Sequence, residues 1–262
     1  MSSLTTRIQQ RTGRLVLDAL APVGRFSALM VDMARGLPEV RIWLPRTIDE
    51  AYKIGFGSLF IVLLIASFAG AVTALQAGYQ FTGNIPIYVV GSLVTESIVL
   101  ELGPVLVGLI LAGRIGARYA AELGTMRVTE QIDALESLGR SPASHLLIPR
   151  VLACLVMIPI LVVFADVIAV ISGWFAAKQK LPITDQDFAY GARTFWRPFD
   201  AYYSVIKAFC FAASIALISC YRGFTTKQGA EGVGSSTTGA VVTSSVLILL
   251  LDLVLAQLLL DH

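Results

Sequence analysis

The stretch from Ile54 to Ala77 reads IGFGSLFIVLLIASFAGAVTALQA and contains no charged residue. A helix of this length, at about 1.5 Å per residue, crosses the hydrocarbon core of a bilayer, which is about 30 Å thick. Four further apolar runs follow, at about 87–111, 151–177, 201–219 and 239–260. The 262-residue chain is therefore predicted to be an all-α integral membrane protein with five transmembrane helices in one domain, residues 54–262.

The composition supports a membrane protein without catalytic groups. Hydrophobic residues make up 56% of the chain and charged residues 15%, whereas a soluble domain usually carries about 25% charged residues. The cysteines are odd in number and lie in or beside apolar runs, so no disulfide framework is expected. His145 and His262 lie far apart in the sequence, so no metal site and no histidine-based catalytic site is predicted.

Residues 1–53 form a basic arm ahead of the first span. Apolar residues recur in it every three or four positions with arginines between them, which favours an amphipathic helix lying along the membrane surface. Pro22 is expected to bend this helix, and the stretch from Pro38 to Pro45 is expected to end it. The alternative is an ordinary soluble helix that packs on a partner.

The distribution of basic residues predicts the orientation. Fifteen of the twenty Lys and Arg residues lie in the arm, in the loop 113–150 and after Ser219, whereas four lie in the stretch 178–197. Loops rich in Lys and Arg stay on the cytoplasmic side. The N-terminus is therefore expected in the cytoplasm and the C-terminus outside it.

The loop between the second and third spans contains a candidate surface helix at about residues 125–138. Gly124 and Gly139 bracket it, and Pro142 follows. One face is apolar, and the rest carries a polar set: Arg127, Glu130, Gln131, Asp133 and Glu136. Such a helix suits a groove in a soluble partner, but the pattern equally fits a solvated helix that has no partner.

Five ionisable residues lie within the predicted spans: Glu96, Glu101, Asp166, Lys207 and Asp252. Charges inside a bilayer are costly, so these side chains should face protein or a wet cavity. Lys207 needs a carboxylate partner, and Asp252 on the neighbouring span is the expected one, in a pair that fixes helix register.

Glu101 is the candidate for the lining of a central cavity or for a gate. Pro104 frees the carbonyl of Leu100 from its helical hydrogen bond, and Gly103 permits a close approach of another backbone. Glu96 lies one turn away on the same span. The alternative is a buried, protonated Glu101 that is hydrogen-bonded within the bundle.

Four motifs resemble those of the MlaE/YrbE permease family: Glu101-Leu-Gly-Pro104, Ala112-Gly-Arg-Ile-Gly116, Ala121-Glu-Leu-Gly124 and Met126-Arg-Val-Thr-Glu-Gln-Ile-Asp-Ala-Leu135. The family pattern can carry Arg where this sequence has Leu100. The resemblance implies the membrane subunit of an ABC transporter that moves phospholipids or related lipids in the bacterial inner membrane. It also implies a homodimer on a separate ABC ATPase, an MCE-domain protein on the outer face, and a coupling role for the helix 125–138.

The chain is not expected to be an enzyme or to bind a cofactor. The Gly-rich stretch 229–239 lacks the Gly-Lys-Ser/Thr of a phosphate loop and is expected to be a flexible cytoplasmic approach to the fifth span. ATP would therefore be used by a partner subunit, and no nucleic acid is expected as a partner. Two alternatives stay open: a proton- or ion-coupled transporter using Glu96, Glu101 and Asp166, and a membrane scaffold that transports nothing.

Overall fold

The computed structural model describes residues 21–80 and 86–260. Most of the predicted connector at 83–86 and the first twenty residues of the arm lie outside the described residues. Within the described ranges there is no strand, and five helical segments are long and apolar enough to cross a membrane. The predicted all-α fold with five spans is therefore confirmed.

The segments are longer than the predicted spans, because helix continues past the apolar core into charged sequence. The first segment is α2 (Val40–Gln80), so the predicted limit between the arm and the permease domain, at residues 53 and 54, lies inside this helix. The second is a chain of α3 (Val89–Ser97), η1 (Ile98–Leu102), α4 (Gly103–Leu111), η2 (Ala112–Gly116) and α5 (Ala117–Val128). The remaining elements are α6 (Gln131–Ser137), η3 (Ala143–Leu147), α7 (Ile148–Lys180), α8 (Asp185–Thr194), α9 (Pro198–Phe224) and α10 (Ala230–Leu260).

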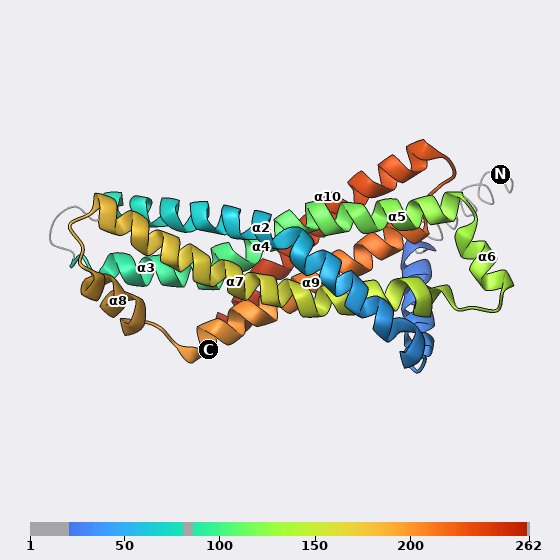
Figure 1. The fold of residues 1–262 in the computed structure, drawn as a ribbon, viewed down its shortest axis with the longest axis horizontal. Coiled ribbons are helices and arrows are strands. Elements are labelled where there is room, and N and C mark those ends of the chain that lie inside the picture. Colours follow the sequence, from blue (N-terminus) through green and yellow to red (C-terminus); the bar gives the residue numbers. More distant parts are fainter. Residues whose placement is uncertain (1–20, 81–85, 261–262) are drawn as a thin grey trace, which may run out of the picture.

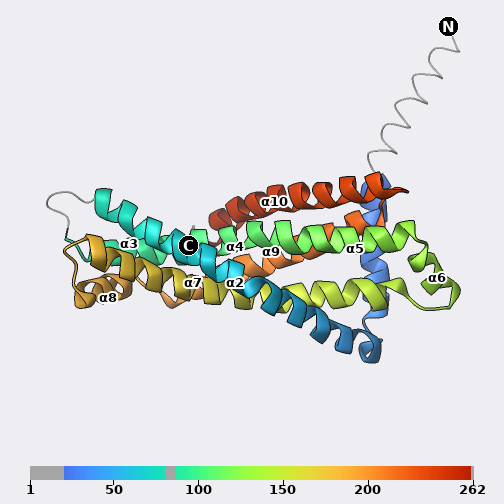
Figure 2. The same cartoon turned by 45° about the horizontal axis from the view of Figure 1, so that its top comes forward.

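The long helices form an elongated bundle with α6 at one end and α8 at the other (Figure 1). A helix covering residues 21–36 lies across the bundle at the α6 end (Figure 2), which is the geometry expected of a helix on a membrane surface. This helix ends at Gly36, just before the expected Pro38. Pro45, in contrast, lies inside α2, in its second turn, where it removes a single helical hydrogen bond.

The Gly-rich stretch 229–239 is helical, which corrects the expectation of a flexible approach to the fifth span. Only Gly229 keeps a left-handed conformation, with φ of 91°, and α10 begins at the next residue, Ala230. Threonines inside the stretch bond to the helix backbone, as Thr237 does to the Val233 carbonyl. A helix with many small residues still forms here because α10 packs against α9 and α5.

Helix α8 was not predicted, although its start carries a readable signal. The Thr184 hydroxyl accepts a hydrogen bond from the Asp187 backbone, and the Asp187 carboxylate accepts one from the Thr184 N–H, which is a capping box. Lys178 donates a hydrogen bond to Asp185, and this bond lowers the pKa of the Asp185 carboxyl. Helix α8 packs on α3, where a Cβ on Gly191 would lie 1.8 Å from the Tyr88 carbonyl oxygen.

Helices α2 and α7 make the most extensive contact of the bundle, and glycine brings them together. A Cβ on Gly70 would lie 1.9 Å from the Ala169 carbonyl oxygen, and Gly173 faces the Gly70 backbone. Small residues at such crossings let helix backbones pack closely where the bilayer offers no hydrophobic drive for association.

We expect Gly70→Ala to lower the stability of the bundle by about 1–3 kcal/mol, because the added methyl group forces α2 and α7 apart. Thermal unfolding of the protein in detergent measures the loss. Gly57→Ala in the same helix is the matched control, since a Cβ there meets only the Arg114 side chain, at an ordinary 3.6 Å. Equal melting temperatures for the two variants would contradict this account of the contact.

Candidate functional site: an intramembrane ionic cluster and a terminal surface helix

The second span is interrupted next to Glu101. Pro104 has no N–H to donate to the Leu100 carbonyl, and the chain widens into the π turn η1, in which the Gly103 N–H bonds to the Ile98 carbonyl instead. The Lys207 ammonium on α9 donates a hydrogen bond of 2.9 Å to the freed Leu100 carbonyl oxygen. The backbone irregularity therefore creates an acceptor for a charged side chain.

Lys207 also lies between two carboxylates. It donates a hydrogen bond of 2.7 Å to Glu101 Oε2, and it forms an ion pair with Asp252 of α10. The ring of Tyr203 completes the surroundings, with its centroid 4.9 Å from the Lys207 nitrogen. The cluster joins the second, fourth and fifth spans through one ammonium group.

The three charged side chains differ sharply in exposure within the single chain. The Lys207 side chain is fully buried and that of Asp252 is 13% exposed, but the Glu101 side chain is 52% exposed. Two carboxylates around one ammonium leave an excess negative charge on the open side. Glu101 is thus a polar group on the outer surface of a membrane-spanning helix, where it requires a further partner.

Two of the residues predicted for the cavity or gate, Glu96 and Gly103, do not join this cluster. Glu96 is half-buried on α3 and makes none of the contacts of Lys207. Gly103 faces the opposite way, where a Cβ would lie 1.7 Å from Asp166 Oδ1 of α7. Asp166 is buried and accepts a hydrogen bond of 2.9 Å from Ser204, so it belongs to a separate polar contact between α7 and α9.

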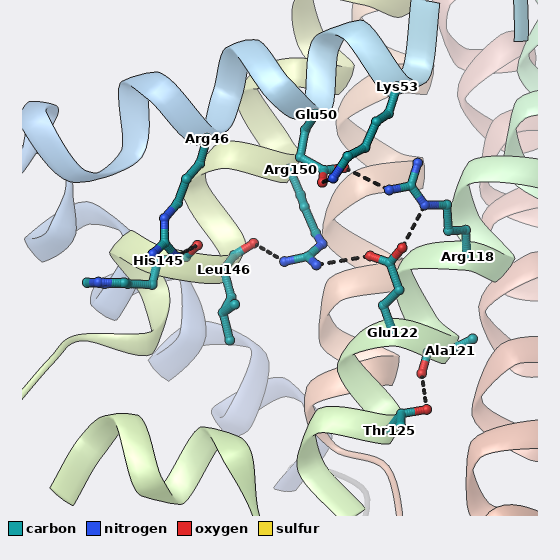
Figure 3. A network of polar contacts seen from close by, with 10 residues as sticks. All are labelled: Arg46, Glu50, Lys53, Arg118, Ala121, Glu122, Thr125, His145, Leu146 and Arg150. Carbon is teal, nitrogen blue, oxygen red and sulfur yellow. Dashed lines mark hydrogen bonds and ion pairs between the residues drawn. The ribbon is translucent and has the colours of Figure 1, made fainter. Parts of the chain in front are cut away.

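A second ionic network lies nearer the α6 end and has no counterpart in the sequence-based prediction (Figure 3). Arg118 of α5 bonds to Glu122 at 2.7 Å and to Glu50 of α2 at 3.3 Å. Glu122 accepts a second bond, of 3.0 Å, from Arg150 of α7, and Arg150 also donates to the Leu146 carbonyl. The network ties α2, α5 and α7 together where α5 leads to the surface helix.

The surface helix differs from the prediction of one helix over 125–138. Residues 125–128 belong to α5, and α6 covers only Gln131–Ser137. The break falls at Glu130, which has φ of 60° and is the only non-glycine residue with positive φ among the described residues. Gly124 does not end a helix, because it lies in close contact with Thr226, where a Cβ would be 2.9 Å from the Thr226 hydroxyl oxygen.

The short helix α6 still presents the predicted polar surface. Ile132 is buried and anchors the helix, whereas Glu130, Gln131, Asp133 and Glu136 are exposed. Arg127, partly exposed at the end of α5, forms an ion pair with Asp133 that spans the break. Leu138 follows with 76% of its surface exposed, an apolar residue that the sequence-based prediction had not singled out.

These features define a class: a multi-pass α-helical membrane protein with ionisable groups between its spans and a charged helix at one end. A family model described as Permease MlaE matches residues 47–258. The chain belongs to the MlaE permease family, as the sequence motifs indicated.

Named relatives agree with this assignment. The chain is 38% identical over 252 residues to a probable ABC transporter permease protein of Rickettsia prowazekii, covering 96% of this chain and 97% of the relative. It is 38% identical over 204 residues to a probable ABC transporter permease protein of Synechocystis, with 78% of each chain covered. A probable ABC transporter permease protein of Porphyra purpurea is 35% identical over 216 residues, with 82% of each chain covered. The chain is thus an ABC transporter permease, whose class implies an ATPase partner.

Proposed function

We propose that this permease moves phospholipids or related lipids between the bacterial inner membrane and an MCE-protein conduit, with Glu101 at the gate of the lipid path. The observation that carries the proposal is the half-exposed Glu101 carboxylate on a membrane-spanning helix, backed by Lys207 and Asp252. Amphipathic substrates need a path with both apolar walls and a polar group, and this surface combines exposed apolar side chains of the spans with one open carboxylate.

The exposed side of the Glu101 carboxylate also suggests that the chain forms a homodimer. A homodimer that brings two copies of this surface together would enclose the two carboxylates in a shared cavity, removed from hydrocarbon. An isologous contact of this kind is the commonest way in which two identical chains associate. An MCE-domain protein on the face opposite the ATPase would then receive or supply the lipid.

We further propose that α6 is the docking element for the ATPase and that the α6 end of the bundle is cytoplasmic. The excess of Lys and Arg on that side supports the orientation, which places the C-terminus in the periplasm. Exposed Leu138 beside a row of acidic side chains offers both an apolar anchor and charge for a soluble partner. The network of Glu50, Arg118, Glu122 and Arg150 would carry motion of α5 to the other spans.

The test is transfer of a labelled phospholipid by the permease, reconstituted in liposomes with its ATPase and an MCE-domain partner. Glu101→Gln should slow ATP-dependent transfer by about tenfold, because the neutral amide loses a charge-assisted bond to Lys207 worth about 1.5 kcal/mol or more. Glu96→Gln is the matched control, an identical change on the same segment outside the cluster. The permease without its ATPase should hydrolyse no ATP.

Two outcomes would overturn the proposal. Transfer that continues without ATP but follows an imposed proton gradient would favour an ion-coupled transporter. Normal lipid transfer by Glu101→Gln would remove Glu101 from the lipid path.

A further inference from the structure

A groove lies on the opposite side of the second span from the ionic cluster. Its volume is about 410 Å³, and its wall comes from α3 with η1, from α7, and from α9 with the residues that precede it. Val99 and Glu101 stand two residues apart in η1, so their side chains leave nearly opposite sides of the turn. The groove is therefore separate from the gate proposed at Glu101.

The lining of the groove is almost wholly apolar. Valine side chains dominate it, and Val163, Val167 and Ile171 of α7 are exposed along its length. Polar atoms come from Thr95, Ser204 and Asp166. The Thr95 hydroxyl is occupied by the Gly91 carbonyl and that of Ser204 by Oδ2 of Asp166. The other Asp166 oxygen, Oδ1, accepts no hydrogen bond but is buried against Gly103 of the second span, so the lining offers little to a polar ligand. A hydrocarbon occupant matches such a surface.

The position of the groove fits a lipid chain in the leaflet at the α8 end. Trp196 lines the groove just ahead of α9, and tryptophan favours the level of the lipid headgroups. From Val163 to Ile171 the groove follows eight residues of α7, about 12 Å. One leaflet contributes about 15 Å of hydrocarbon to the bilayer core, so the groove holds most of one chain. An apolar groove bounded by Trp196 at the level of the headgroups is suited to a single acyl chain.

We propose that this groove is a binding site for one acyl chain of a membrane lipid whose headgroup lies beside Trp196. The site is distinct from the lipid path at Glu101. A chain bound there contacts Val99 on the back of the η1 turn, so it supports the turn that carries Glu101 from the side that the transported lipid does not reach.

The test uses the full-length permease in nanodiscs without its ATPase, so that its result is independent of transport. The probe is a phosphatidylcholine with a photoactivatable diazirine midway along one acyl chain, present as a small fraction of the lipid. After illumination, mass spectrometry of peptides should find labels concentrated on the groove residues of α7 and α9. Val170→Phe, which fills the groove, should reduce this labelling to the level of other lipid-facing residues.

Val156→Phe is the matched control, since Val156 is also exposed on α7 but lies outside the groove. It should leave groove labelling unchanged. If all exposed α7 residues are labelled equally, or if Val170→Phe does not reduce the labelling, the bound molecules are ordinary annular lipid. Either result would overturn the proposed site. Loss of groove labelling in the assembled transporter, with cross-links to a partner's helix in its place, would overturn it as well.

Discussion

Lys207→Met is expected to lower the free energy of unfolding by about 3–5 kcal/mol, the usual loss when one partner of a buried ion pair is removed. The variant keeps an unbranched apolar side chain of nearly the same length, but within the described residues it removes the cation that pairs with Asp252 and Glu101. The Leu100 carbonyl, already free of its helical bond because of Pro104, loses its donor too. Thermal or denaturant-induced unfolding in detergent measures the effect.

Neutralising Glu101 and Asp252 as well tests whether the loss of stability in Lys207→Met comes from unpaired charge. Replacing the whole cluster with neutral groups, as in Lys207→Met with Glu101→Gln and Asp252→Asn, should recover much of the lost stability, because no unpaired charge stays in the bundle. A triple variant as unstable as the sum of the three single changes would show that the groups act independently. The pair Lys207 and Asp252 would then have no coupled role in fixing helix register.

Reversing two charges on the surface helix is the second large effect. Glu130→Lys with Asp133→Lys should weaken binding of the ATPase by about 2 kcal/mol or more, roughly thirtyfold, because like charges then meet across the interface. Both side chains are exposed and outside the spans, so the variant should insert and fold normally. Co-purification and ATP-dependent lipid transfer are the two measurements.

The structure also supplies the controls for this variant. Asp133→Lys breaks the ion pair with Arg127, so Arg127→Glu with Asp133→Lys restores an internal pair and separates local stability from docking. A reversal at the opposite end of the bundle, Asp185→Lys beside α8, should leave binding unchanged. If the α6 variant assembles with the ATPase and transports lipid as the wild type does, then α6 is a solvated helix without a coupling role.

The fold could be predicted largely from runs of apolar residues, since the bilayer permits few backbone structures. The ends of the helices could not be, because helices such as α5 continue into charged sequence once other helices satisfy the charges. Arg118 and Arg150 appear in the sequence as loop residues, whereas in the structure they lie on helices and share Glu122. Pairings between residues 28 or more positions apart leave no local pattern.

The candidate site was predictable only in its parts. Proline at 104 indicated a free Leu100 carbonyl, and the rarity of charge in spans indicated a partner for Lys207. That Glu101 shares Lys207 with Asp252 was not predicted, because the sequence gives the depth of a residue in the membrane only by counting along a span that is assumed to be straight. Tilt of the helices and the wide turn η1 make such depth scales inaccurate.

The wide turns η1 and η2 bear on how the second span tolerates changes in its length. A π turn holds one residue more than an α turn, and it can absorb that residue without altering the helices on either side. Deletion of a single residue inside η2 therefore converts the turn to ordinary helix and leaves α4 and α5 aligned, whereas the same deletion within α4 turns everything beyond it by about 100°.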